Sequence, residues 1–124
     1  MKWKGSGMTK NYFTAREEQC PCCGSGGLVP DFRDKLNKAR QIADVPFILT
    51  SAFRCAAHNA EVGGAETSSH LAGLAVDIKC TDAWTRCKIL SALFAAGFNR
   101  IGVGKTFIHV DDDLTKPQGV VWLY

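Results

Sequence analysis

SSHLAGLAVD, residues 68–77, is the stretch from which the rest of this sequence can be interpreted. It places an imidazole, His70, and a carboxylate, Asp77, seven residues apart among small and apolar neighbours. Burying a carboxylate in such surroundings is costly unless it is paired with a cation or bound to a metal. The end of the stretch has the composition of a short buried strand. We therefore expect a polar site built at a strand of a small sheet.

A second histidine, His109, lies in another apolar segment, and Asp111 follows it two positions later. A β-strand directs alternate side chains to the same face, so His109 and Asp111 share a face. If this strand neighbours the one that carries Asp77, the two side chains meet, and His70 joins them from the preceding loop. Two histidines and one aspartate, with one position left open, are a ligand set that Zn²⁺ accepts in catalytic sites. The sequence therefore predicts one Zn²⁺ per chain, bound by His70, Asp77 and His109.

Length and composition are those of one globular domain. The chain has 124 residues, of which 46% are hydrophobic and 22% charged, which is enough for a single core. A net charge of +3 is too small to indicate a nucleic-acid partner. No apolar run approaches the roughly 20 residues that span a bilayer, so membrane insertion is not expected. Residues 1–7 lack the apolar core of a signal peptide, and we expect a monomer that is cytoplasmic as synthesised.

The order of helix and strand signals predicts an α+β fold in which helices flank a small, mainly antiparallel sheet. Residues 1–12 are expected to form a flexible N-terminus and residues 13–124 a single domain. Helices are predicted at 15–20, 30–43 and 83–96, with one or two helical turns at 56–62. Strands are predicted at 47–51, 74–78, 100–103, 107–111 and 120–124.

The helices carry recognisable end signals. Thr14 followed by Glu17 is a capping box, and Pro30 suits the first turn of a helix. Asp82 and Gly97 can cap the two ends of the helix at 83–96. The inner face of the helix at 30–43 is predicted to contain Phe32, Leu36, Ala39 and Ala43. The inner face of the helix at 83–96 is predicted to contain Trp84, Cys87, Leu90 or Ile89, Leu93 and Phe94.

The six cysteines do not form an obvious framework. Three are clustered in CPCCG, namely Cys20, Cys22 and Cys23, whereas Cys55, Cys80 and Cys87 are scattered along the chain. The cluster could be a small structural metal site, but such a site needs about four ligands and the sequence has no second Cys-x-x-Cys pair. We therefore expect reduced, partly buried thiols. A redox or metal-sensing protein built around the cluster is the alternative.

The stretch at 68–77, with His109 downstream, resembles the signature of the M15 zinc peptidases. These are D-alanyl-D-alanine carboxypeptidases and peptidoglycan endopeptidases, relatives of the Hedgehog zinc site. The matching positions are Ser68, His70, Gly73, Ala75 and Asp77. The resemblance covers residues 11–124. It includes TSAFR at 50–54, HNAEVGGA at 58–65, GFNRIGVG at 97–104, FIHVD at 107–111, and VWLY at 121–124, which fits the short M15A type of phages and prophages.

This resemblance implies a Hedgehog- or DD-peptidase-like fold and zinc ligation by His70, Asp77 and His109, with water in the fourth position. Arg54 matches the family's arginine that grips a substrate carboxylate or carbonyl, and Ser68 is a further candidate for substrate binding. The implied function is hydrolysis of a cell-wall peptide, with a D-Ala-D-Ala bond as the first expected target. An L-Ala-D-Glu endopeptidase of the endolysin type is the alternative. The missing signal peptide fits release onto the wall during phage lysis.

One position departs from the family pattern. Many M15 enzymes carry a general base, Glu or Asp, three residues before the last histidine, and here that position is Thr106. Asp111 is the first substitute, because it could act as the base or could hold His109 through a hydrogen bond. Glu66 is a weaker candidate. The unusual Thr106 also leaves open a non-catalytic, zinc-stabilised domain that binds cell wall or serves as a phage structural part.

The remaining polar residues near these motifs are expected to be peripheral. His58 is predicted to be a surface or packing residue and not a metal ligand, and Asp112 and Asp113 are predicted to lie in a solvated turn. Lys105 is placed in a loop, where it could help to bind an anionic peptide terminus.

Overall fold

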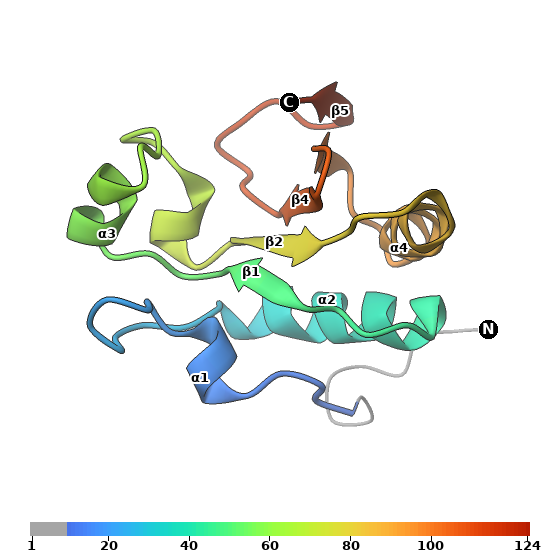
Figure 1. The fold of residues 1–124 in the computed structure, drawn as a ribbon, viewed down its shortest axis with the longest axis horizontal. Helices are drawn as coiled ribbons and strands as arrows, with labels where there is room; N and C mark the ends of the chain where they lie inside the picture. Colours follow the sequence, from blue (N-terminus) through green and yellow to red (C-terminus); the bar gives the residue numbers. More distant parts are fainter. Residues whose placement is uncertain (1–9) are drawn as a thin grey trace.

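The computed structural model describes residues 10–124, and its centre is a five-stranded sheet (Figure 1). The spatial order is β1-β2-β4-β3-β5. Only the β3–β5 pair is parallel among the strand pairs of the described residues, so the sheet is mainly antiparallel as expected. The strands are β1 (Leu49–Ser51), β2 (Ala75–Lys79), β3 (Arg100–Val103), β4 (Phe107–Asp111) and β5 (Val120–Leu123).

The helices follow the predicted order, so the α+β fold is confirmed. They are α1 (Ala15–Glu18), α2 (Pro30–Ala43), α3 (Ala56–Glu61), the 3₁₀ turn η2 (Ser69–Ala72) and α4 (Ala83–Ala95). In Figure 1, α2 lies along the sheet below β1, α4 lies at one end of the molecule, and α3 lies at the other.

The predicted N-terminal capping residues of α1 and α4 form the expected hydrogen bonds. The Thr14 hydroxyl accepts a hydrogen bond from the amide of Glu17, whose carboxylate accepts one from the amide of Thr14, so the capping box is complete. The Asp82 carboxylate accepts from the amide of Thr85 at 2.8 Å and starts α4.

One face of the sheet is apolar and forms the core with α2 and α4. The four predicted inner positions of α2 are buried. In α4 the prediction was partly wrong: Leu93 and Ile89 are buried, but Cys87 is exposed, Trp84 is 65% exposed and Phe94 52% exposed. The buried core residues with almost no exposed surface include Phe32, Leu36, Val76, Ile78, Ile89, Leu93, Phe98, Ile101, Ile108 and Val110.

The opposite face of the sheet is polar. Because the strands are in register, Asp77 of β2, His109 of β4, Gly102 of β3 and Trp122 of β5 form one row across the sheet. A Cβ atom on Gly102 would lie 2.6 Å from the indole of Trp122, so only glycine lets that ring lean across β3. The row brings residues from four strands to one place.

The predicted flexible N-terminus, residues 1–12, falls mostly outside the described residues. Within them, the amide of Tyr12 donates to the side-chain oxygen of Asn37 on α2 at 2.8 Å. None of the helices in residues 10–124 has the length and apolar character required to cross a membrane.

Candidate metal centre

The three predicted ligands converge on the polar face of the sheet. Asp77 and His109 are direct cross-strand partners, and Oδ1 of Asp77 lies 3.0 Å from Nδ1 of His109. Nε2 of His70 lies 3.4 Å from the same oxygen. One potential ligand atom from each residue lies within 4.8 Å of the others. This is the grouping that strand alternation predicted.

His70 reaches the site from η2, immediately before β2. The hydroxyl of Ser68 caps this turn by accepting from the amide of His70 at 3.3 Å. Gly73 ends the turn at a φ of +70°, and a Cβ there would lie 2.5 Å from the carbonyl oxygen of Gly27. Both the backbone conformation and the close approach therefore require glycine, which explains this position of the motif.

Hydrogen bonds on the outer side of each imidazole fix its tautomer. Nδ1 of His70 lies 2.7 Å from the carbonyl oxygen of Ala52, which can only accept, so this nitrogen carries the proton. Nε2 of His109 lies 2.7 Å from Oδ2 of Asp111 and donates to that carboxylate. The other nitrogen of each imidazole, Nε2 of His70 and Nδ1 of His109, therefore faces Asp77.

Asp111 is held on the far side of His109. It is 1% exposed, and its Oδ1 accepts from Nε of Arg100 at 2.7 Å and from the amide of Asp113 at 3.1 Å. Burial raises the pKa of Asp111, but the hydrogen bonds from His109 and Arg100 outweigh burial and lower it. Asp111 is therefore an ionised carboxylate that orients His109, one of the two roles expected for it.

The donor set fits a divalent cation. Burial raises the pKa of Asp77, but hydrogen bonds from His109 and His70 outweigh it and hold the pKa well below its usual range. A cation bound between these residues would take the place of the shared protons, and it would meet one carboxylate oxygen and, from each imidazole in its neutral form, one nitrogen lone pair. Ligand atoms around a tetrahedral Zn²⁺ are about 3.3 Å apart, close to the separations seen here. The residues thus fit zinc.

Arg54 lies beside the donor set. Its Nη2 is 3.6 Å from Oδ2 of Asp77, its Nε donates to the hydroxyl of Ser51 at 3.0 Å, and its Nη1 to Oδ1 of Asn59 at 3.3 Å. Asn59 is itself anchored, since its amide group donates to the carbonyl of Ala65 at 2.8 Å. The guanidinium is thereby positioned at the wall of the site, as a substrate-binding arginine requires.

A cleft opens beside the metal centre as two adjoining hollows of about 370 and 330 Å³. Both are lined by Arg54, Val62, Asp77 and Phe107, and volumes of this order accommodate a small peptide. The larger hollow is also lined by Ser68, Lys116, Trp122 and Tyr124. Thr106 and His58 line the smaller one.

Several residues of the cleft were missed by sequence reasoning. The ring of Trp122 lies 5.5 Å from that of His109, and Cζ of Arg100 lies 5.0 Å from the Trp122 ring. Lys116 donates to the hydroxyl of Ser69 at 2.8 Å. The alternation of Trp122 and Tyr124 along a predicted strand was an available signal, but which face they occupy depends on strand register.

The expected solvated turn at Asp112 and Asp113 was wrong for Asp113. This residue is 7% exposed, and its carboxylate accepts hydrogen bonds from Ser69 at 2.7 Å and from Thr115. By contrast, Glu66 and Lys105 are exposed and do not line either hollow. Among the residues that line the two hollows, Asp77 and Asp111 supply the carboxylates.

A His-Asp-His donor set with buried imidazoles and a partly buried carboxylate, beside an open cleft on one face of an α+β sheet, is an arrangement typical of metallohydrolases. The sequence model of the family described as Peptidase M15 matches residues 9–111, a segment that includes all three donors. The chain therefore belongs to the peptidase M15 family. A search among curated proteins finds no significant match.

Proposed function

We propose that this protein is a zinc-dependent peptidase that cleaves peptidoglycan peptides, at a D-Ala-D-Ala bond. The observation that carries the proposal is the convergence of His70, Asp77 and His109, which bring one potential ligand atom each to within 4.8 Å of the others beside the cleft. When bound there, Zn²⁺ would lower the pKa of a nearby water and polarise a peptide carbonyl. Family membership supports the peptidase activity.

The residues of the chain would bind and orient the substrate around this centre. Arg54 and Lys116 present positive charge to the larger hollow and suit a peptide with a free carboxylate beside the scissile bond. Asp111 would keep His109 in the tautomer that a metal ligand needs. The ring of Trp122 would cover His109 on the side of β5.

Two substrate bonds are compatible with these charges. A D-Ala-D-Ala bond lies next to the terminal carboxylate of the peptide, which fits the Arg54 side of the cleft. An L-Ala-D-Glu bond, cleaved by an endolysin-type enzyme, lies next to internal carboxylates and is the alternative. In either case the protein would act on the cell wall as a monomer, after release from the cytoplasm.

A non-catalytic cell-wall-binding domain is the second candidate. One observation favours it: Thr106 lines the cleft at the position where many relatives carry the general base, and Asp111 approaches the cleft from behind His109. Such a domain would bind zinc and muropeptides without cleaving them.

The test is cleavage of purified muropeptides by the zinc-loaded protein, with products identified by mass spectrometry. The variant Asp77→Asn keeps the shape of the side chain but removes its charge, and Asp112→Asn is the matched control because Asp112 pairs with Lys35 away from the donors. We expect release of D-alanine by the wild type and by Asp112→Asn, and none by Asp77→Asn. A wild type that holds zinc at His70 and His109 yet cleaves neither bond would establish the binding domain instead.

A further inference from the structure

A second group of potential metal ligands lies where the loop after α1 meets the start of α3. It consists of Cys20, Cys22, Cys23 and Cys55, whose sulfur atoms all lie within 4.8 Å of one another. Cys55 is far from the CPCCG cluster in the sequence, but the fold brings it beside the cluster. The fold supplies the fourth ligand that the sequence appeared to lack.

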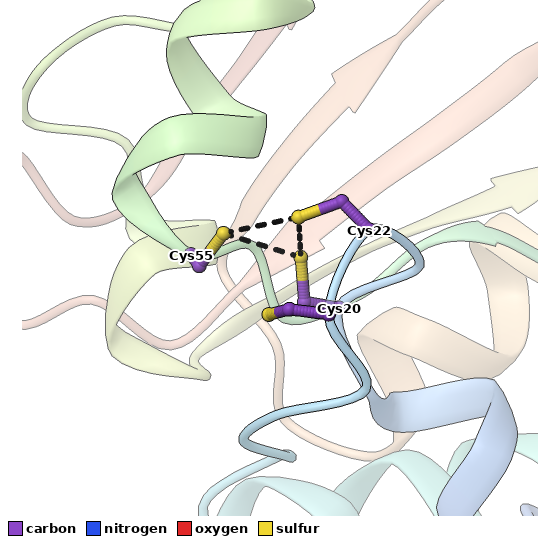
Figure 2. A group of neighbouring side chains, drawn as sticks. Cys20, Cys22 and Cys55 are labelled. Atoms are coloured by element: carbon purple, nitrogen blue, oxygen red, sulfur yellow. Dashed lines mark hydrogen bonds between the residues drawn. The ribbon is translucent and has the colours of Figure 1, made fainter.

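Three of the sulfur atoms form a triangle, shown in Figure 2. The distances between sulfur atoms are 3.3 Å for Cys22 and Cys55, 3.4 Å for Cys20 and Cys22, and 3.5 Å for Cys20 and Cys55. A disulfide joins only two sulfurs and would leave the third without an equivalent partner. Four thiolates around a tetrahedral Zn²⁺ lie about 3.8 Å apart, so a small outward movement of these three would admit the ion, with the Cys23 sulfur within 4.8 Å as the fourth ligand.

The backbone already holds the two segments together. The amide of Gly24 donates to the carbonyl of Cys20 at 2.8 Å, and the amide of Cys20 to that of Ser25 at 2.9 Å, which forms a tight turn around the clustered cysteines. The amide of Phe53 donates to the carbonyl of Glu18 at 3.2 Å and fixes the chain just before Cys55. The four sulfurs are thus brought together by backbone contacts of the fold.

We propose that Cys20, Cys22, Cys23 and Cys55 bind a structural Zn²⁺ ion that is separate from the His70 centre. Four thiolates close the coordination sphere and leave no position for a substrate, which is the mark of a structural site. Cys20 and Cys23 have the Cys-x-x-Cys spacing of such sites. Cys22 and Cys23 are exposed, so the ion can enter from solvent.

This ion would influence the cleft by holding in place the backbone beside it. Cys55 directly follows Arg54 and precedes α3, whose C-terminal end leads to Val62 at the cleft wall. Fastening Cys55 to the loop at 20–24 therefore restrains the backbone that carries Arg54. The role of this ion is structural, and the proposal does not depend on the chemistry at His70.

The first test counts zinc in protein purified under reducing conditions with zinc present. We expect about two ions per chain in the wild type, about one in Cys55→Ser, and about one in Asp77→Asn. Cys87→Ser is the matched control, because Cys87 is an exposed cysteine of α4 that pairs with Ser91, and it should keep both ions. A His70 centre that binds no metal would lower the wild-type count without removing the effect of Cys55→Ser, so the two proposals fail separately.

The second test needs no variant and so does not depend on whether Cys55→Ser folds. Cobalt replacement should give the intense absorption of a tetrahedral cobalt thiolate in the wild type, and metal loading should protect four thiols from an alkylating reagent. Zinc content unchanged by Cys55→Ser, or no thiolate absorption with cobalt, would overturn the proposal. So would a mass deficit of two hydrogens per chain that disappears on reduction, since it would show a disulfide within the cluster.

Discussion

At the scale of single residues, the candidate centre depends on an ordered chain of contacts from Asp77 through His109 to Asp111 and Arg100. Desolvation lowers the pKa of His109, but its hydrogen bonds to Asp111 and Asp77 outweigh this effect and raise it. Arg100 in turn neutralises Asp111 at 2.7 Å. The Asp111–Arg100 pair thus determines which nitrogen of His109 is available to a metal.

Replacing Asp111 by Asn should therefore weaken zinc binding, although all three ligand residues remain in place. We expect zinc affinity to fall by about 10- to 100-fold, because the orienting carboxylate of a metal-bound histidine has an effect of this size. Competition with a chromophoric chelator measures it, with Asp112→Asn as control. If Asp111→Asn bound zinc like the wild type but lost all cleavage, Asp111 would be the general base instead.

Arg54 carries the second prediction at this scale. Arg54→Lys keeps the charge but cannot form the paired hydrogen bonds of a guanidinium, so it should bind a substrate carboxylate less well. A hydrogen bond to a charged group contributes about 1.5–3 kcal/mol, which corresponds to a loss of about 10- to 150-fold in kcat/KM. Zinc content should not change.

The control for the Arg54 prediction is a change in the substrate. A peptide with an amidated C-terminus lacks the carboxylate, and we expect the wild type to cleave it as poorly as Arg54→Lys cleaves the free acid. Equal rates of wild-type cleavage on free and amidated peptides would show that Arg54 does not bind this carboxylate.

The motif residues could be predicted from the sequence because they obey local rules, whereas their supporting residues could not. His70, Asp77 and His109 follow from strand alternation and apolar surroundings. Arg100 and Trp122 reach the same place only through the pairing of β3 with β4 and β5, which a single sequence does not specify. Cys55 joins its cluster through the same kind of long-range contact.

At the scale of elements, the helices show where periodicity succeeds and where it is ambiguous. In α2 the apolar residues occupy one face, and the structure buries that face. In α4 apolar residues occur on several faces, so the pattern did not distinguish the buried Ile89 and Leu93 from the exposed Trp84 and Phe94. Contacts with α2 decide the orientation of α4.

The packing of α2 gives a prediction about stability. Leu36 is fully buried, and Leu36→Ala should lower the free energy of unfolding by about 2–5 kcal/mol through lost contacts and a cavity. Ile42 lies on the same helix but is about half exposed, and Ile42→Ala should cost less than about 1 kcal/mol. Urea unfolding of both variants measures the difference. Similar losses for both would show that α2 is not oriented with Leu36 toward the core.

At the scale of the whole molecule, the sheet separates two tasks. Its apolar face forms the core with α2 and α4, and its polar face carries the donors and the cleft. The segment after β4 is connected to η2 through Asp113, whose carboxylate contacts Ser69 of η2 as well as Lys116 and Thr115. Global stability therefore depends in part on a carboxylate at the edge of the cleft.

This carboxylate predicts how stability changes with pH. Desolvation raises the pKa of Asp113, but hydrogen bonds from Thr115 and Ser69 outweigh it and lower the pKa from 3.8 to about 2. A lowered pKa in the folded state stabilises the fold above the ordinary value, and the contribution is lost as pH falls from about 4 to about 2. For this buried group the contribution is on the order of 2 kcal/mol.

The measurement is urea unfolding of wild type and Asp113→Asn in the presence of a chelator, which removes metal binding from the comparison. The wild type should be more stable by about 2 kcal/mol at neutral pH, and the gap should close as pH falls through the acid range, because both side chains are then uncharged. Asp112→Asn, at a partly exposed ion pair with Lys35, should differ from the wild type by less than about 1 kcal/mol at every pH. A gap for Asp113→Asn that persisted unchanged at the lowest pH would mean that the shape of the side chain, and not its charge, connects η2 to the segment after β4.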